Sequence, residues 1–427
     1  MRNLDVFIEI HGKEYYVGGI HGNNVMDASF KYDHEYLNKG HAISVMLPLR
    51  KEMFSPSETS CFFEGLLPEG FSRKSVAAWL HADENDYLTI LAGLGKECLG
   101  AIRIEEAGRN EVDDPQYELL TAKQVKELAA EGATKSTELL VKSHLSLTGA
   151  SGKVGLYYNE GRWFQPIGTA PSTHIVKQSH VRLKHIVENE QLSLRTAAHL
   201  GIPTIDSFIV NHGTYQDSEI LLASKRYDRN IENSVKSIDG MPCPLRLHQE
   251  DFAQALGIPG QRKYESVGDG YLEKIFNLIR KNSNNPLRDQ ILLLDILIYD
   301  VLIGNTDNHI KNLSLLYSSD LSGIALAPAY DLVSTMLYKE STAEMSIVIA
   351  DEILWDRINK DTFIAASPEM GISSKVIERE YKRLVEKFPV ALEESMKELR
   401  LEGFLNIDEI GQNMMRLYES VVLRKRG

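Results

Sequence analysis

The feature that most constrains this sequence is a mostly apolar stretch, residues 287–303, followed directly by the polar segment GNTDNHIKN at residues 304–312. The apolar stretch is long enough for a helix that is buried on most of its surface. A polar segment on such a helix is costly unless its side chains find partners or bind a ligand. Because functional residues concentrate on loops held by rigid elements, we interpret residues 304–312 as a site; a capped, solvated loop is the alternative.

The spacing inside this segment is typical of phosphoryl transfer. Asp307 and Asn312 are separated as in the kinase catalytic loop H-R-D-x-x-x-x-N, where the Asp accepts the substrate hydroxyl proton and the Asn binds a metal ion. Residues 313–317 and 324–326 are predicted to form a β-hairpin, after which Asp331 stands where a kinase carries its second magnesium ligand. The D-F-G motif is replaced by Asp-Leu-Val, and a helix N-cap is the alternative role for Asp331.

Two further kinase-like parts lie upstream. Residues 144–158 are predicted to form a strand, a glycine turn and a strand, and such a turn can cradle an anion with its amides. A Walker A motif is excluded by its spacing, and a plain hairpin is the alternative. Lys177 is expected on the next strand, pointing away from the face that holds Ile175, and Glu190 on the next helix could pair with it. Taken alone, Lys177 or Glu190 is more simply interpreted as a charged residue on the surface.

The order of elements predicts the α+β fold class. A β-rich half precedes a helical half that begins near residue 245, which favours two lobes. The acidic, loop-like stretch 105–118 is interpreted as a boundary. Outside the motifs, the pattern predicts a strand at 43–48 and C-terminal helices at 373–388, 390–402 and 406–425.

Composition excludes several classes of protein. The 43% of hydrophobic residues argues against disorder, and the net charge of −13 argues against nucleic-acid binding through the overall field. Cys61, Cys98 and Cys243 form no C-x-x-C pair, so we expect neither a structural zinc site nor a disulfide framework. No apolar run is long enough to span a membrane, and we expect a cytoplasmic protein.

Together these motifs resemble the HipA family of serine/threonine kinases, the toxins of bacterial type II toxin–antitoxin modules. The resemblance is near full length, and the G-N-x-D-x-H-x-K-N string carries it most specifically. The blocks that resemble the family are FFEGLLPEG (62–70), GKECLGAI (95–102), SLTGASGK (146–153), PSTHIVK (171–177), NEQLSLRTAAHLGI (189–202), RLHQEDFAQALGI (246–258), KYES (263–266), LIGNTDNHIKN (302–312) and LAPAYDLVS (326–334).

The resemblance implies a protein-kinase-like bilobal fold with a β-rich N-terminal lobe and an all-helical C-terminal lobe. Its parts would be an N-terminal HipA-type subdomain at 1–105, a kinase N-lobe at 106–235 and a C-lobe at 236–427. It also implies ATP and Mg²⁺ as cofactors. Asp307 would be the catalytic base, Asn312 and Asp331 the metal ligands, and Glu190 the partner of the lysine. The residues that would contact the nucleotide are Thr148, Gly149, Ala150, Ser151, Gly152, Lys153, Lys177, Lys225, Arg226, Tyr227, His309, Lys311, Asn312, Tyr330 and Asp331.

Family members silence themselves by phosphorylating a serine in the glycine loop, and Ser146 stands at the matching position. Here Ser151-Gly152 replaces the Gln-Glu that often precedes the loop lysine, so Thr148 and Ser151 compete with Ser146 as the modified residue. Lys225-Arg226-Tyr227 replaces the family's frequent Glu-Arg-Phe, a change that backbone hydrogen bonds to adenine would survive.

The resemblance also implies partners. These are a helix-turn-helix antitoxin of the HipB type, DNA only through that antitoxin, and a protein substrate for which the family's aminoacyl-tRNA synthetases are the precedent. Three alternatives stay open at this point: a kinase-fold scaffold that binds ATP and an antitoxin without transferring phosphate, a metal-dependent hydrolase using Asp307, His309 and Asp331, and a kinase for lipids or small molecules.

Overall fold

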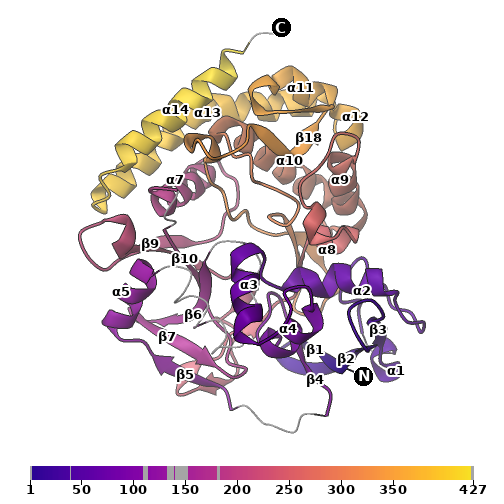
Figure 1. Ribbon diagram of the computed structural model, residues 1–427. Coiled ribbons are helices and arrows are strands. Elements are labelled where there is room, and N and C mark those ends of the chain that lie inside the picture. The colour runs from indigo at the N-terminus through magenta and orange to yellow at the C-terminus, as the bar shows by residue number, and fades with distance from the viewer. Residues whose placement is uncertain are drawn as a thin grey trace. The chain divides into compact units, whose positions relative to one another are not determined.

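The computed structural model describes residues 2–38, 40–108, 114–131, 139, 152–179 and 183–424 (Figure 1). The chain forms two compact units. The first contains residues 1–180, 210–260 and 315–324, and the second contains residues 181–209, 261–314 and 325–427. Helices and sheets are both present, so the predicted α+β class is confirmed. The three-segment division at residues 105 and 235 stays a prediction.

The first unit begins with a four-stranded sheet in the order β3-β2-β1-β4. Strands β1 and β2 form an antiparallel hairpin, and in β1 Leu4, Val6 and Ile8 alternate into the core as the pattern of a half-buried strand requires. The elements here are β1 (Arg2–Ile10), β2 (Lys13–Gly22), β3 (Ser29–Tyr32), α1 (His34–Leu37), α2 (Pro56–Phe63), α3 (Gly70–Trp79), α4 (Tyr87–Leu94) and β4 (Ile102–Glu106).

The strand predicted at residues 43–48 is wrong, because these residues form bends. Their amides bind side chains instead of a neighbouring strand. Ile43 N donates to the Tyr32 hydroxyl at 3.1 Å, and Val45 N donates to Glu250 Oε1 at 2.9 Å. Apolar alternation alone could not reveal these side-chain acceptors.

The first unit also contains a six-stranded sheet, in the order β5-β7-β6-β8-β10-β9. The strand expected to carry Lys177 is confirmed as β8, and part of the acidic stretch expected to be a loop forms β5 and pairs with β7. The elements are β5 (Gln116–Leu119), α5 (Ala122–Glu131), β6 (Lys153–Asn159), β7 (Arg162–Ile167), β8 (His174–Gln178), β9 (Ser207–Asn211), β10 (Ile220–Lys225), β11 (Arg229–Asn230), β12 (Ser237–Ile238), β13 (Met241–Pro242), β14 (Leu245–Arg246), β15 (Gln249–Asp251) and α8 (Phe252–Leu256).

The second unit is mainly helical. Its helices are α7 (Ile186–His199), α9 (Tyr271–Asn282), α10 (Pro286–Ile303), α11 (Lys360–Ala365), α12 (Ser367–Met370), α13 (Ser374–Leu401) and α14 (Ile407–Val422). It is not all-helical, because β18 (Glu344–Ile349) and β19 (Glu352–Leu354) pair within it. The predicted hairpin after the polar loop is confirmed as β16 (Ser314–Tyr317) and β17 (Ile324–Leu326), of which residues 315–324 belong to the first unit.

The helices predicted at 373–388 and 390–402 are one helix, α13, with Pro389 inside it. An internal proline costs about 3 kcal/mol because it removes a hydrogen bond and clashes with the preceding turn. Phe388, Ala391 and Leu392 are buried on either side of Pro389, so the apolar face continues past it. Packing of that face keeps the helix intact.

Helix α10 is buried along most of its length, as predicted. Asn285 caps its N-terminus, Pro286 occupies the first turn, and Gly304 ends it in the left-handed conformation with φ 66°. The Tyr299 hydroxyl donates to the Ser193 carbonyl of α7 at 2.7 Å. The helix therefore holds the polar segment that follows it on a fixed base.

Candidate functional site

The polar segment 304–312 folds back onto the helix that precedes it. Asp300, fully buried in the last turn of α10, accepts hydrogen bonds from Asn305 Nδ2 at 2.8 Å and from Asn308 Nδ2 at 2.6 Å. Burial raises the pKa of the Asp300 carboxyl to about 8, although the two amides lower it. Two of the asparagines that made this segment so polar therefore have a structural task.

Asp307 and Asn312 are brought together by the same loop. The Asn312 side-chain amide donates to the backbone carbonyl of Asp307 at 3.2 Å, and the Asp307 amide donates to Asn305 Oδ1, also at 3.2 Å. The Asp307 carboxylate is exposed and accepts a hydrogen bond from the Tyr264 hydroxyl at 2.7 Å. The loop thus presents one carboxylate outward while Asn312 supports its backbone.

Asp331 lies in a segment that is bonded to both ends of this loop. On one side of it, the Tyr330 hydroxyl donates to the Lys311 carbonyl at 3.1 Å. On the other side, Ser334 Oγ donates to the Ile303 carbonyl, and Thr335 Oγ1 donates to the Gly304 carbonyl at 3.0 Å. The helix N-cap interpretation of Asp331 is wrong, since Ser334 occupies that place before the next helical turn.

Asp331 itself adopts a left-handed backbone conformation with φ 57°. This region is sparsely populated by residues other than glycine, although Asp and Asn tolerate it best. Such outliers persist where the surrounding structure fixes them, and the bonds from Tyr330, Ser334 and Thr335 do so here. The side chain is partly exposed. His309 and Lys311, predicted on the nucleotide side of the loop, are both buried.

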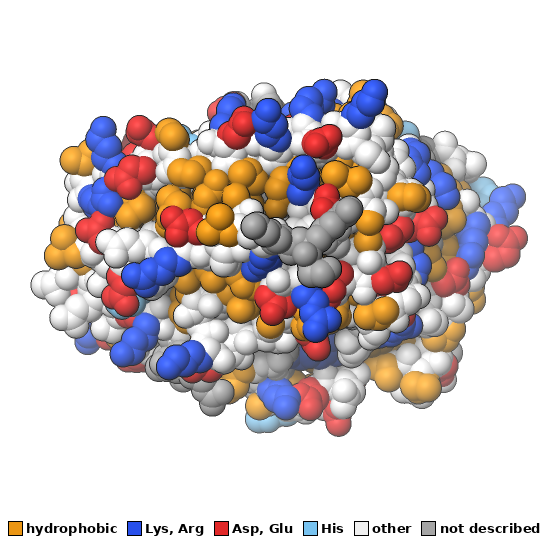
Figure 2. All heavy atoms as spheres, turned by 90° about the horizontal axis from the view of Figure 1, so that it is seen from above, with side chains coloured by type: hydrophobic (Ala, Val, Ile, Leu, Met, Phe, Trp, Pro, Cys, Tyr) orange, Lys and Arg blue, Asp and Glu red, His pale blue; other side chains and the backbone are white. Residues whose placement is uncertain are grey.

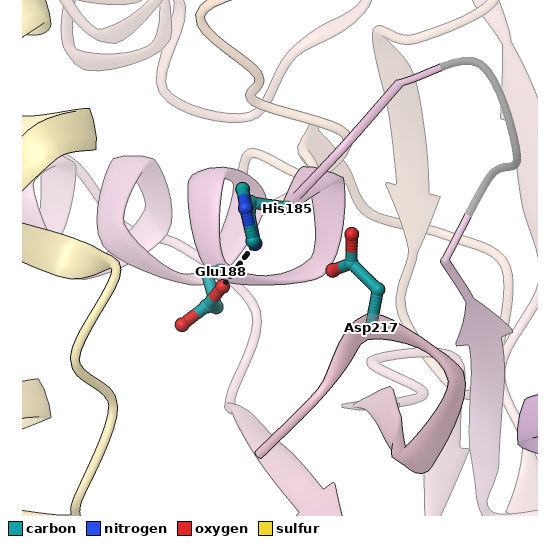
Figure 3. A group of neighbouring side chains, drawn as sticks. All are labelled: His185, Glu188 and Asp217. Atoms are coloured by element: carbon teal, nitrogen blue, oxygen red, sulfur yellow. Dashed lines mark hydrogen bonds and ion pairs between the residues drawn. The ribbon is translucent and has the colours of Figure 1, made fainter.

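Helix α7 starts beside these segments and carries Glu190, which is buried. Figure 3 shows its first turn, where His185 Nδ1 and Glu188 Oε2 are 3.0 Å apart. The Asp217 side chain drawn with them belongs to the first unit. Lys177 lies on β8 in the first unit and Glu190 in the second, so their pairing stays a prediction.

Lys177 occupies a different face of its strand from the one expected. In β8 the residues His174, Val176 and Gln178 are buried, while Ile175 and Lys177 are partly exposed. Ile175 and Lys177 therefore share a face, because strand side chains repeat every two residues. Lys177 is directly opposite Lys153 of β6 in the antiparallel register, which places two ammonium groups on one face.

The segment predicted to border the adenine, residues 225–227, contains both an exposed and a buried residue. Lys225 ends β10 and is exposed, and the Tyr227 hydroxyl donates to Gln249 Oε1. Arg226 is buried: its guanidinium pairs with Asp228 and Glu97, and its amide donates to the Thr173 carbonyl at 2.9 Å. The Arg226 side chain and amide thus have structural partners.

Glu97 is the centre of that buried network. Its carboxylate pairs with Arg226, Arg229 and Arg246 at 2.9–3.0 Å and accepts the Ser172 amide at 3.2 Å. The three guanidinium groups hold the pKa of the Glu97 carboxyl below its ordinary value, against the effect of burial. Sequence reasoning missed this role, although three of the family-like blocks quoted above meet at this one side chain.

Several predicted positions lie outside the described residues: Ser146, Thr148, Gly149, Ala150 and Ser151. Gly152 is described and partly exposed, directly before β6. The trio required for the hydrolase alternative is described in full, and Asp307, His309 and Asp331 do not bring three ligand atoms within 4.8 Å of one another.

Sequence reasoning also missed Tyr264 and Asp300. Asp300 carried a signal, because a carboxyl in an apolar helix needs partners and two asparagines follow it closely. Tyr264 stood in the KYES block without an assigned role, and only the fold brings it to Asp307.

The fold and the loop that joins Asp307 to Asn312 define a protein-kinase-like class of protein. A model of the HipA-like C-terminal domain matches residues 145–392, and a model of the HipA N-terminal domain matches residues 8–105. The chain belongs to the HipA family.

Similar proteins agree with this assignment. The chain is 31% identical over 368 residues to protein Y4mE of Sinorhizobium fredii, whose name marks it as a candidate kinase, with 84% of each chain covered. It is 26% identical over 400 residues to the serine/threonine-protein kinase toxin HipA of Shewanella oneidensis, covering 91% of this chain and 88% of the relative. A solved complex of Shewanella oneidensis HipA, HipB and operator DNA has the same fold, with a TM-score of 0.79 at 23% identity over 98% of this chain and 96% of that one.

Two surface properties bear on partners. Figure 2 views the molecule from above and shows Lys and Arg interspersed with Asp and Glu around hydrophobic side chains. Mixed charge of this kind does not favour direct attraction of nucleic acid to this face. Among the described residues, none of the helices combines the length and the apolar character needed to cross a membrane.

Proposed function

We propose that this protein is an ATP- and magnesium-dependent serine/threonine-protein kinase, the toxin of a HipBA-like toxin–antitoxin module. The observation that carries the proposal is the loop in which the Asn312 amide supports the Asp307 backbone while the Asp307 carboxylate stays exposed. Phosphoryl transfer requires little covalent chemistry from a protein and depends mainly on positioning and charge stabilisation. A loop anchored by Asp300 and by the Asp331 segment meets that requirement.

In the proposed reaction Asp307 accepts the proton of a serine or threonine hydroxyl. The hydroxyl oxygen forms a bond to the γ-phosphorus of ATP, the bond to the bridging oxygen breaks, and ADP leaves with the electron pair. Exposure of the Asp307 carboxylate supports this role, because a protein substrate must reach it.

Asn312 and Asp331 fit a magnesium site by the chemistry of their donors. An amide oxygen and a carboxylate oxygen are hard ligands of the kind that Mg²⁺ prefers. Asn312 uses its amide nitrogen in the bond to the Asp307 carbonyl, which leaves the amide oxygen as the candidate ligand. When bound, the ion would neutralise negative charge on the nucleotide phosphates.

Lys153 and Lys177 are proposed to bind the phosphates. The two residues lie directly opposite one another on neighbouring strands, and each ammonium group can form charge-assisted hydrogen bonds to phosphate oxygens. The glycine segment at residues 148–152 is proposed to cover the phosphates, while the backbone at Lys225 and the ring of Tyr227 are proposed to border the adenine. His309, Lys311 and Tyr330 are proposed to lie on the nucleotide side, and Glu190 is proposed to fix the lysine.

We further propose that the kinase phosphorylates itself at Ser146, Thr148 or Ser151 and is thereby silenced. The proposed partner is a small helix-turn-helix antitoxin, through which DNA is contacted indirectly. The solved complex of the Shewanella oneidensis relative with HipB and operator DNA supports this proposed partner. The proposed target is a cytoplasmic protein of the aminoacyl-tRNA synthetase class.

Intact-mass spectrometry tests the kinase proposal. Dephosphorylated protein is incubated with ATP and Mg²⁺, and peptide mapping locates any added phosphate. We expect one HPO₃ group on Ser146, Thr148 or Ser151, absent from the Asp307→Asn variant. If the wild-type protein binds ATP in calorimetry and gains no phosphate, the scaffold alternative replaces the kinase proposal.

A further inference from the structure

Tyr264 is a half-exposed residue of the second unit that contacts Asp307 directly. Its hydroxyl donates to Asp307 Oδ1 at 2.7 Å, while its side chain remains 50% exposed. Its ring meets the His309 ring edge-on, with centroids 5.2 Å apart. An exposed phenol can satisfy itself with water, so the contact with Asp307 needs a reason in the backbone that carries Tyr264.

That reason is the anchoring of the next residue, Glu265. Its amide donates to the Ser346 carbonyl of β18 at 3.0 Å. Its buried carboxylate accepts the amide of Val348 at 2.7 Å and the amide of Tyr271, at the start of α9, at 2.6 Å. Three bonds to two elements fix the backbone at Tyr264, although its ring is only partly covered.

The strand that holds Glu265 also holds the loop of Asp307. Ser346 Oγ donates to the Thr306 carbonyl at 2.6 Å, and Thr306 directly precedes Asp307. The Thr306 amide in turn donates to Thr335 Oγ1 at 2.8 Å. Both ends of the Tyr264–Asp307 bond are therefore held by β18, so the two side chains meet at a fixed separation.

We propose that Tyr264 is a positioning residue that orients the Asp307 carboxylate for proton acceptance. The inference rests on the proposed kinase function and adds to it a residue that the motif does not contain. A carboxylate offers about four acceptor positions, so a bond from Tyr264 and a bond from a substrate hydroxyl are compatible on one group. A bond to a fixed donor limits rotation of the carboxylate, which maintains the geometry that transfer requires.

Tyr264→Phe tests this directly, because it removes the hydroxyl and keeps the ring that contacts His309. We expect the rate constant for self-phosphorylation at saturating ATP to fall about tenfold, with the KM for ATP unchanged. Val267→Ala is the matched control, since Val267 is exposed nearby in the same unit. A Tyr264→Phe variant with the wild-type rate constant would overturn the proposal.

A second readout does not depend on activity. The urea midpoints of Tyr264→Phe, Asp307→Asn and the double variant form a double-mutant cycle. We expect Tyr264→Phe to lower the midpoint in the wild-type background and to change it little in the Asp307→Asn background. If the shifts of the two single variants add up to the shift of the double variant, the Tyr264 hydroxyl does not act through Asp307. Absence of phosphorylation in the wild type would instead contradict the proposed function, while the cycle would still report whether the two side chains are coupled.

Discussion

Asn189 and Ser334 exchange a pair of hydrogen bonds: the Ser334 amide donates to Asn189 Oδ1 at 3.0 Å, and Asn189 Nδ2 donates to the Ser334 carbonyl, also at 3.0 Å. The same Asn189 amide group reaches the Tyr338 hydroxyl at 3.1 Å. Asn189 is buried on α7, next to Glu190, and Ser334 follows Asp331 closely. The Asn189 side chain therefore supplies the Ser334 backbone with the two hydrogen bonds that a neighbouring strand would otherwise provide. Ser334 belongs to the segment that carries Asp331, a proposed metal ligand.

Asn189→Ala should lower the free energy of unfolding by about 2–3 kcal/mol, because it leaves buried backbone groups of Ser334 without partners. Urea denaturation measures this change. Gln412→Ala, on the exposed side of α14, is the control and should change little. We also expect slower phosphoryl transfer in the alanine variant. Wild-type stability in Asn189→Ala would show that water replaces the side chain.

Asp300 should make stability depend on pH. Burial raises the pKa of its carboxyl from 3.8 to about 8, so the folded state favours the neutral form. The contribution of Asp300 is therefore fully present below about pH 4 and is lost as the pH rises through 8, by up to about 1.4 kcal/mol per pH unit. The free energies of unfolding of wild type and Asp300→Asn, measured from pH 5 to 9, should differ increasingly in favour of the variant up to about pH 8, and the difference should level off above it.

The amide introduced by Asp300→Asn should be accommodated by a neighbouring side chain. Asn308 Oδ1 is buried without a hydrogen-bond partner among the described residues, so a flipped Asn308 amide can accept from the new side chain. Asp300→Ala offers no such exchange, and we expect it to cost about 2–5 kcal/mol. A parallel pH dependence in wild type and Asp300→Asn would contradict the assignment.

Glu97→Ala should destabilise the first unit severely. Removing this carboxylate leaves the buried guanidinium groups of Arg226 and Arg229, and the partly buried one of Arg246, with fewer counter-charges. Breaking a buried ion pair costs about 3–5 kcal/mol. Thermal denaturation followed by circular dichroism measures the loss. Glu52→Ala, at an exposed position of the same unit, is the control. An unchanged melting temperature would show that the network contributes little.

Lys177→Ala and Lys153→Ala should each weaken ATP binding about tenfold or more, since each removes a charge-assisted contact from the proposed phosphate site. Isothermal calorimetry at two salt concentrations measures the dissociation constant and its salt dependence. Lys31→Ala, exposed on β3, is the control for loss of charge. Wild-type affinity in both variants would remove these lysines from the nucleotide site.

The sequence motifs predicted the residues of the candidate site better than they predicted the structure around it. Asp307 and Asn312 could be paired from spacing alone, because a single loop carries both. The face of Lys177 was misassigned, although strand periodicity was sufficient to place it with Ile175. Glu97 and Tyr264 could not be assigned, because their partners are distant in sequence and only the fold brings them together. Pro389 shows the same limit, since burial on both sides outweighs a local breaker.

The path of the chain through its two units has a consequence for synthesis. The first unit is completed only by residues 315–324, which follow α7, α9 and α10 of the second unit in the sequence. On a ribosome, which delivers the chain from its N-terminus, the first unit must therefore wait for this late segment, which pairs with β15, before it is whole. A nascent chain of this protein thus cannot assemble either unit early, and any activity that needs both units begins only when translation is well past residue 324.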